Sequence, residues 1–236
     1  MWCDSRSNLV KLHKDELYLR LGSIVINPSE TLRDLGVLLD SELTMRPHIA
    51  RTASTCFFHL RRLRQLRRFA DQSTMQRLVS AFVIARLDYC NSVMAGPTAS
   101  SLAPLNRVLS AAVRLVAGLG PRDHVTEHMK RLYWLPTQFR IKFKLCVLMH
   151  GAVYGQSPSY IKDVFVPLSD LPGHTRLRSA AGQYEVPFTR TQFGRRALSV
   201  AAPTEWNNLP ANLRSIADIT AFKKAIKTHL FRQAYS

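Results

Sequence analysis

The stretch "LAPLNRVLSAAVRLVAGLG", residues 102–120, decides what kind of fold this chain adopts. Its apolar side chains recur at intervals of three and four, at Leu102, Leu105, Val108, Leu109, Ala112, Val113 and Val116. That interval places them all on one face of an α-helix. Gly118 and Gly120 follow the last apolar position, where glycine suits a helix end. The stretch therefore predicts a helix with one broad buried face.

Three further segments show the same helical period. Residues 72–94 carry it at Met75, Leu78, Val79, Phe82, Val83, Leu87 and Cys90. Residues 137–150 contain neither glycine nor proline and carry it at Ile141, Leu145 and Leu148. Near the end, Asp218 is a good N-cap for a helix that buries Phe222, Ile226 and Leu230. Most of the chain after Thr44 is therefore predicted to be helical.

The first 44 residues indicate strands instead. "LYLRL" and "IVINP" alternate apolar and polar side chains around Gly22-Ser23, which predicts a hairpin with a Gly-first turn. Residues 34–40 are a third short strand candidate. A sheet this small must pack against another part of the chain. We expect a mainly α (α+β) fold with a small N-terminal antiparallel sheet, a helical bundle and an irregular C-terminal region that ends in a helix. The expected boundaries are 1–44, 45–154 and 155–236, with a further hairpin possible over Leu177–Phe188.

The charge of the chain indicates its partners. The 236 residues carry a formal net charge of +17, with an isoelectric point near 10.4. Residues 1–44 hold five cations and seven acids, a net charge of −2, so the remaining residues carry +19. Such an excess favours nucleic acid or an anionic membrane surface. There is no apolar run of membrane-spanning length, and the start does not have the pattern of a signal peptide. We expect an intracellular protein and leave nucleus or cytoplasm open.

The run "HLRRLRQLRRF", residues 59–69, holds five arginines and no acid. On a helical wheel the apolar Cys56, Leu60, Leu63, Leu66 and Phe69 cover one side. Arg61, Arg64, Arg67 and Arg68 gather within roughly 120° of the other side. Arginines so close repel one another unless an anion is bound, which favours phosphate binding. The alternatives are that they only solubilise the helix or pair with acids elsewhere. Membrane-surface binding is less favoured, because the apolar stripe lacks tryptophan.

Five more cations are candidates for the same role: Arg107, Arg114, Arg140, Lys142 and Lys144. Arg107 and Arg114 are seven apart, and so lie on one helical face. Contacts of this kind to a phosphate backbone supply affinity and register but no choice of sequence.

Cysteines and histidines give no sign of a metal or cofactor. Cys3, Cys56, Cys90 and Cys146 are far apart, and none belongs to a C-x-x-C pair, so buried free thiols are expected. His124 and His128 have the i, i+4 spacing of two metal ligands, but no third ligand is near in the sequence. We expect no catalytic residue, metal site or cofactor.

Four stretches in this order carry a resemblance to a known family. They are "LRDLGVLLDSELTMRPHI" (32–49), "ARLDYCNSVMAG" (85–96), "LYWLPTQFRIKFKL" (132–145) and "AAPTEWNNLPANLR" (201–214), with "FKKAIKTHLF" (222–231) after the last. Together they resemble the region C-terminal to the catalytic palm in reverse transcriptases of LINE-type, non-long-terminal-repeat retrotransposons. The most similar groups are the chicken-repeat-1 and jockey-like elements.

The resemblance implies that residues 1–44 correspond to the last strands of the palm. The basic helices of residues 45–154 would then correspond to the thumb that grips a template-primer duplex. The family's Tyr-x-Asp-Asp turn, which holds two metal ions, is absent from this sequence. The chain alone is therefore expected to lack RNA-directed DNA polymerase activity.

The aspartates that remain are interpreted as structural. We expect Asp34 and Asp40 at strand ends or turns, and Asp88 as a packing or capping partner. Tyr89, Trp134 and Trp206 are interpreted as core anchors that also hydrogen-bond. The function predicted is non-catalytic, sequence-tolerant binding of RNA or an RNA–DNA duplex backbone. Two alternatives stay open: part of a polymerase that is active only with an upstream palm, or a scaffold that binds a protein through the uncovered palm-facing surface.

Overall fold

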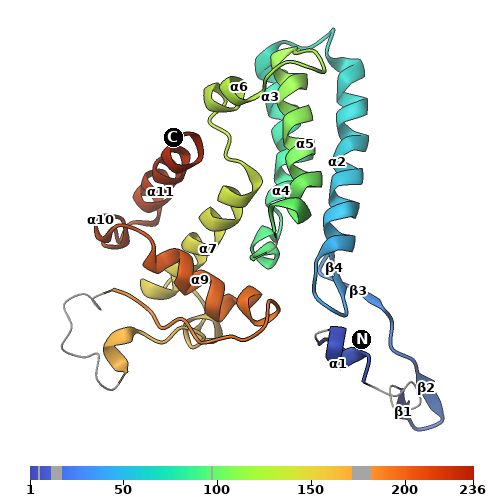
Figure 1. Cartoon of the computed structure of the whole chain (residues 1–236). Coiled ribbons are helices and arrows are strands. Elements are labelled where there is room, and N and C mark those ends of the chain that lie inside the picture. The colour runs from blue at the N-terminus through green and yellow to red at the C-terminus, as the bar shows by residue number, and fades with distance from the viewer. Residues whose placement is uncertain (5, 12–17, 97, 172–181) are drawn as a thin grey trace.

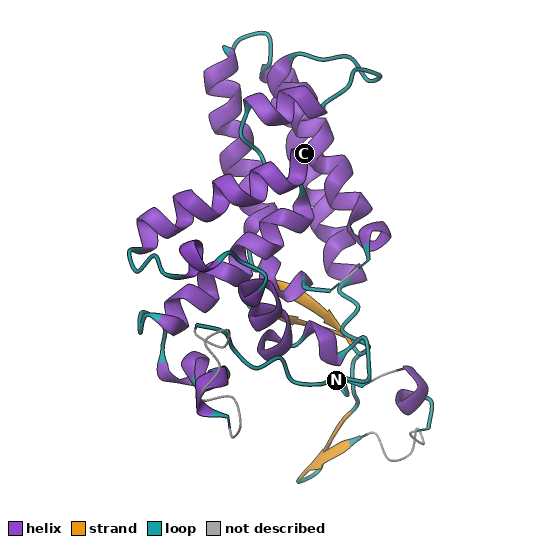
Figure 2. Ribbon diagram, turned by 60° about the vertical axis from the view of Figure 1, so that its left-hand side comes forward, coloured by secondary structure: helices purple, strands orange, loops and turns teal. Residues whose placement is uncertain are grey.

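The structure is a computed structural model that describes residues 1–4, 6–11, 18–96, 98–171 and 182–236. It is mainly α-helical, with two small antiparallel sheets of two strands each near the N-terminus (Figures 1 and 2). The fold class predicted from the sequence is therefore confirmed.

The elements follow one another in the order labelled in Figure 1. The N-terminal part contains α1 (Arg6–Leu9), β1 (Leu19–Leu21), β2 (Ile24–Ile26), β3 (Thr31–Asp34) and β4 (Val37–Asp40). The middle part contains α2 (Arg46–Leu66), α3 (Gln72–Val79), the π-helix η2 (Ser80–Ile84), α4 (Ala85–Asp88), the 3-10 helix η3 (Asn91–Met94), α5 (Ala99–Ala117), α6 (Thr126–Arg131) and α7 (Thr137–Val153). The C-terminal part contains α8 (Ser159–Lys162), η4 (Leu168–Asp170), η6 (Gly194–Arg196), α9 (Leu198–Asn207), α10 (Ala211–Arg214) and α11 (Ile219–Tyr235).

Helix α2 begins at a turn that Asp40 holds. One carboxylate oxygen of Asp40 accepts from the Thr44 amide at 2.9 Å, and the other accepts from the Met45 amide at 2.9 Å. Pro47 lies in the first turn of α2, where its missing amide hydrogen is not needed. The predicted strand-end role of Asp40 is confirmed.

Helices α2 and α5 pack side by side, with α3 and α4 against them (Figure 1). All seven positions of the apolar stripe of residues 102–116 are buried, as predicted. Gly118 ends α5 with φ +69°, the left-handed conformation that glycine adopts without strain. The stripe of α2 is buried at Cys56, Leu60 and Leu63, but Leu66 and Phe69 are exposed. These two lie where α2 ends and the chain turns toward α3, so no helix covers them.

The helix predicted over residues 72–94 is interrupted. It consists of α3, η2 and α4, followed by a break at Tyr89 and Cys90 and then by η3. A π-helical turn holds one more residue than an α-helical turn, so it rotates the face that follows. Phe82 is consequently 43% exposed, and Ile84 is buried in its place. The sequence-based prediction that Phe82 is a core residue is wrong for this reason.

Helix α7 is the central element of the second half, between α5 on one side and α9 and α11 on the other (Figure 1). It contacts α5, α9 and α11, and its apolar residues belong to the same hydrophobic cluster as those of α2 and α5. Phe222, Ile226 and Leu230 of α11 are buried in that cluster, and the carboxylate of Asp218 accepts from the Ala221 amide at 2.6 Å. The predicted C-terminal helix, its cap and its buried face are confirmed. The hydrophobic core thus crosses the boundary predicted at residue 154.

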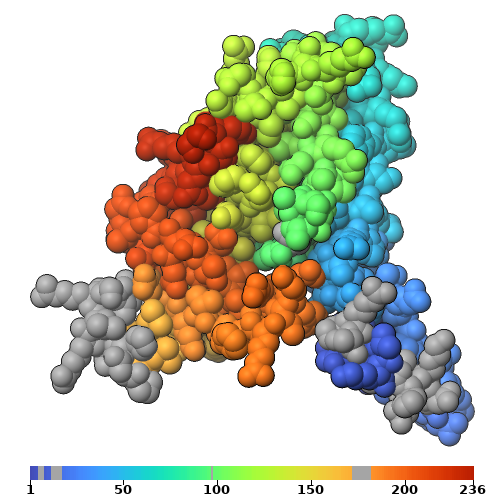
Figure 3. Space-filling view, viewed as in Figure 1, coloured from blue at the N-terminus to red at the C-terminus, as the bar shows by residue number. Residues whose placement is uncertain are grey.

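The N-terminal strands form two separate hairpins. Strands β1 and β2 pair with Leu21 opposite Ile24, as predicted, whereas β3 pairs only with β4. The third strand was therefore wrongly assigned to one three-stranded sheet, because the Leu35-Gly36 turn gives β4 its own partner. All residues of β1 and β2 are exposed, and this hairpin projects from the body of the molecule (Figure 3). The expectation that the N-terminal strands pack against the rest of the chain is wrong for this hairpin, but it holds for β4, which contacts α2 and buries Val37.

The residues predicted to be core anchors or buried thiols differ in their burial. The indole nitrogen of Trp206 donates to the Gly182 carbonyl at 3.0 Å, and Trp134 is also buried. Tyr89 is exposed and is not a core anchor, although its hydroxyl donates to the Leu35 carbonyl at 2.6 Å. Cys3 is exposed, contrary to the expectation of buried thiols.

The hairpin predicted over Leu177–Phe188 lies partly outside the described residues. Residues 182–188 form no strand, although Tyr184 makes a single bridge with Pro167.

Candidate nucleic-acid interface

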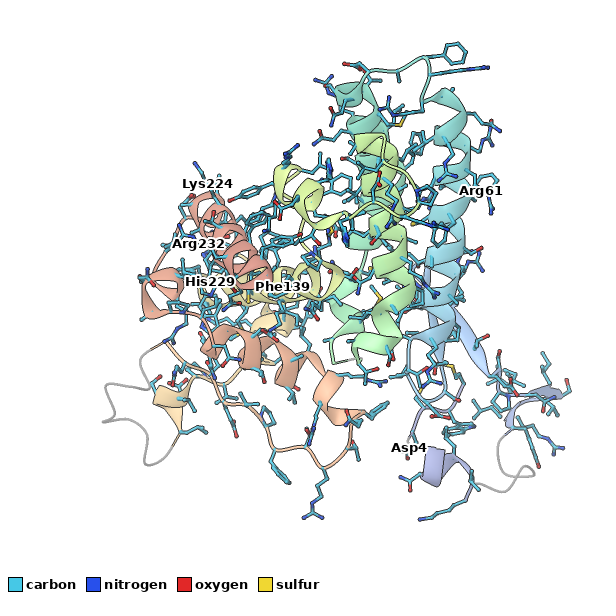
Figure 4. The ribbon with its side chains drawn as sticks, turned by 45° about the horizontal axis from the view of Figure 1, so that its top comes forward. Asp4, Arg61, Phe139, Lys224, His229 and Arg232 are labelled. Atoms are coloured by element: carbon cyan, nitrogen blue, oxygen red, sulfur yellow. The ribbon has the colours of Figure 1, made fainter. Side chains whose placement is uncertain are left out.

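The candidate interface begins at the C-terminal end of α2. Arg61, Arg64 and Arg68 are exposed there, and Arg67 is half-buried. Figure 4 places Arg61 on the outer side of α2, away from the other helices. The buried Leu60 and Leu63 fix the orientation of Arg61, because the step of about 100° from Leu60 to Arg61 turns that arginine away from the buried side of the helix.

Three arginines line one groove between α2 and α5. Arg64 of α2, Arg67 directly after α2 and Arg114 of α5 border a hollow of about 560 Å³, whose other lining residues are apolar or glycine. The structure thus brings together two arginines of the run and one that lies far along the sequence. No acidic side chain is among the residues that line this groove. We use the name arginine strip for Arg61, Arg64, Arg67, Arg68 and Arg114.

Backbone carbonyl groups orient the two inner arginines. The Nε of Arg67 donates to the Leu115 carbonyl at 3.1 Å, and a terminal nitrogen of Arg114 donates to the Asp123 carbonyl at 3.2 Å. Gly118 makes room for Arg67, because a Cβ on that residue would lie 2.9 Å from the guanidinium. Carbonyl partners leave the positive charge of both guanidinium groups unneutralised. The Nε of Arg114 is buried and has no hydrogen-bond partner among the described residues.

The arginine strip is free of ion pairs with the described residues. The ion pairs among the residues that the structure describes join Lys130 to Glu127, Arg140 to Asp88 and Lys142 to Glu205. Each like-charge pair at helical spacing in the strip disfavours the free state by a few tenths of a kcal/mol. The dipole of α2 offsets part of this repulsion, since cations near a helix C-terminus gain about 0.3–1 kcal/mol.

The remaining predicted site residues lie in different surroundings. Arg107 is exposed on α5, about two turns before Arg114 on the same helical face. Arg140 donates through Nη1 to both carboxylate oxygens of Asp88, at 3.0 and 2.8 Å, and through Nε to the Leu135 carbonyl at 2.8 Å. Its guanidinium therefore links α7 to α4, and we exclude it from the arginine strip.

The two lysines of the "RIKFK" stretch differ from each other. Lys142 forms an ion pair with Glu205 at 3.3 Å, which ties α7 to α9. Lys144 is exposed and lines a second cavity, which Lys227 of α11 also borders. Lys227 did not stand out from the sequence because its helix carries other lysines on the same polar side. Neither lysine of the stretch lines the groove between α2 and α5.

His124 and His128 have the spacing of two metal ligands, although no metal site was expected from the sequence. Among the described residues, no group of three or more His, Cys, Asp or Glu side chains is close enough to hold a metal ion. His124 is exposed and His128 is half-buried. Asp40 holds the turn before α2, and Asp88 pairs with Arg140, so both have structural partners as predicted. Within the described part of the chain, the helices are all too short or too polar to cross a membrane.

Comparisons with known protein families, with curated proteins and with solved structures found no match to this chain.

Proposed function

We propose that this chain binds the phosphate backbone of RNA or an RNA–DNA duplex through the arginine strip, without choice of sequence and without catalysis. The observation that carries the proposal is the groove in which Arg64, Arg67 and Arg114 converge and to which no carboxylate contributes. Arg61 on the outer side of α2 and Arg68 just after the helix are exposed, and we propose that they contact the same duplex beside the groove. Each guanidinium can donate to a phosphate in a bidentate manner.

The net charge of +17 supports the proposal, because it attracts a polyanion at long range. The resemblance to the region downstream of the palm in LINE-type reverse transcriptases also supports it. In that family the corresponding helices form a thumb, and we propose that the arginine strip grips a duplex as a thumb does. Phosphate contacts of this kind hold any sequence equally well.

The test is a salt titration of binding to a short RNA–DNA hybrid. The variant R61Q/R64Q/R68Q removes three exposed charges and leaves the carbonyl-bound Arg67 in place. Each lost phosphate contact lowers the slope of log K against log salt by about 0.9, so the slope decreases by up to about 2.7. Between about 50 and 200 mM KCl, wild type then loses about 40-fold more affinity than the variant does.

A charge-matched control separates the strip from overall charge. The variant K223Q/K224Q/R232Q removes three exposed cations from α11 and should retain the wild-type slope. Equal effects of the two triple variants would show that only bulk charge matters, and no effect of the α2 variant would remove the strip from the binding surface. Addition of a separate palm polypeptide in a primer-extension assay tests whether the same grip can serve a polymerase.

A further inference from the structure

The second cavity, away from the groove between α2 and α5, has the features of a binding site for a small ligand. It encloses about 400 Å³ and is bordered by α4, η3, the loop after α6, α7 and α11. That volume lies within the range of small-molecule sites, which is about 300–1,000 Å³. Because three regions far apart in the sequence contribute to it, residues 84–91, 133–144 and 227, its shape depends on the complete fold.

One of the residues that line the cavity has a buried polar atom without a partner. Asn91 is 3% exposed and lines the cavity, and its side-chain oxygen has no hydrogen-bond partner among the described residues. Leaving such an acceptor buried and unpaired is unfavourable, because it has lost its hydrogen bonds to water. A ligand with an N–H donor would satisfy it. The chain holds this residue in place directly after Cys90, whose φ of +48° is itself unusual for a side chain with a Cβ.

Another lining residue presents an aromatic ring. Tyr133 lines the cavity and is 43% exposed, and its ring stacks on Phe231 with centroids 4.4 Å apart. The backbone of Tyr133 has φ +57° at the end of α6, a position that glycine usually takes. Strain of this kind persists where a side chain has a use. A partly exposed aromatic ring supported from behind is a platform for a planar ligand.

The charges around the cavity favour an anion. Lys144 and Lys227 line it, and the Lys227 ammonium lies 5.2 Å from the centre of the Tyr133 ring. Arg140 and Asp88 also line it and neutralise each other through their ion pair. Three cations and one carboxylate leave a net charge of +2 on the lining residues.

We propose that this cavity binds one nucleotide unit. The base stacks on Tyr133 and donates an N–H to the side-chain oxygen of Asn91, and the phosphate lies between Lys144 and Lys227. Aromatic stacking combined with a hydrogen bond to a base edge is how proteins bind unpaired bases of RNA. The unit can come from a free mononucleotide or from an unpaired nucleotide in a strand. The site goes beyond the duplex grip proposed above and does not depend on it.

Calorimetric titration of the full chain with AMP, adenosine and ribose 5-phosphate tests the proposal. AMP should bind at least about tenfold more tightly than either fragment, since each fragment lacks one of the two recognised groups. The variant N91L replaces the amide by an apolar group of similar size, and should weaken AMP binding about fivefold. It should leave ribose 5-phosphate binding unchanged. AMP that binds no better than ribose 5-phosphate, or N91L with wild-type affinity for AMP, overturns the proposal.

A second variant tests the proposal without changing a buried residue, since N91L could also alter the packing of the core. K144Q/K227Q changes only side chains that reach solvent, and should lower AMP affinity about tenfold. Its control is K224Q, which removes a charge from α11 outside the cavity and should bind AMP as wild type does (Figure 4). An unchanged affinity in K144Q/K227Q also overturns the proposal.

Further measurements identify the source of the nucleotide and separate the two sites. A single-stranded adenylate of about five residues should bind at least about tenfold more tightly than AMP if the cavity serves a strand. Equal or weaker binding identifies a free mononucleotide as the ligand. R61Q/R64Q/R68Q should keep wild-type AMP affinity, and N91L should keep the wild-type salt slope for the hybrid. Failure at one site therefore leaves the other site's result intact.

Discussion

Replacement of Asp88 by asparagine should destabilise the protein because it breaks the ion pair that links α4 to α7. The side chain of Arg140 is only 12% exposed, and that of Asp88 is 44% exposed. Arg140 donates to both carboxylate oxygens, and its Nε donates a further hydrogen bond to the Leu135 carbonyl. After the substitution a nearly buried guanidinium would have lost its counter-charge.

The size of the effect follows from these exposures. Breaking a fully buried pair costs about 3–5 kcal/mol, whereas an exposed pair contributes about 0–1 kcal/mol. Here Arg140 is nearly buried and Asp88 is half-exposed, so the effect should lie between these limits. We therefore expect D88N to lower the free energy of unfolding by about 2 kcal/mol. A double-mutant cycle with R140Q should give a coupling energy of about 1–2 kcal/mol.

Urea denaturation followed by tryptophan fluorescence measures this effect as a lower midpoint at unchanged slope. The matched control is E127Q, which breaks the exposed pair between Glu127 and Lys130 and should change the unfolding free energy by less than about 0.5 kcal/mol. If D88N is as mild as E127Q, our reasoning about burial is refuted. Arg140 would then be free to contact phosphate, as its sequence context predicted.

Two further predictions concern stability. The pKa of His150 is lowered by burial, so the unfolded chain binds more protons, and stability present above about pH 6.5 is lost as the pH falls. The melting temperature should therefore drop between about pH 7.5 and 5.5, and H150F should flatten this trend in part, because burial also lowers the pKa of His48. An equal drop in H150F would assign the trend to other groups. Asp218 caps α11 by accepting a hydrogen bond from the Ala221 amide. In urea denaturation, D218A should lower the free energy of unfolding by about 1 kcal/mol, whereas D218S should stay near wild type. Equal losses in the two variants would show that the cap hydrogen bond is unimportant.

Sequence patterns correctly predicted the elements that depend on interactions between residues close together in the sequence. The stripe of α5 and the cap and buried face of α11 are read directly from residue spacing, and the structure has them as expected. Phe82 was misplaced because a π-helical turn shifts the phase of a periodic pattern without changing its composition. The hairpin of β1 and β2 was located correctly, but whether its apolar side chains are covered depends on the rest of the fold.

The candidate sites show the same division. Clustering of Arg61, Arg64 and Arg68 follows from the helical period alone. The pairing of Arg140 with Asp88 joins residues 52 positions apart, so no local pattern indicates it. The cavity at Asn91 depends on segments still farther apart, and its main signal, a buried acceptor without a partner, exists only once the chain has folded.

The dependence of α7 on α11 has a consequence for synthesis of the chain. Helix α7 leaves the ribosome well before Ile219, the first residue of the helix that covers one of its sides. At roughly 5–20 residues per second, that apolar side stays uncovered for several seconds in each nascent chain. Chaperones that hold exposed apolar segments have this interval in which to act. Translation that stops short of α11 would therefore yield an aggregating product even when the arginine-bearing helices are complete.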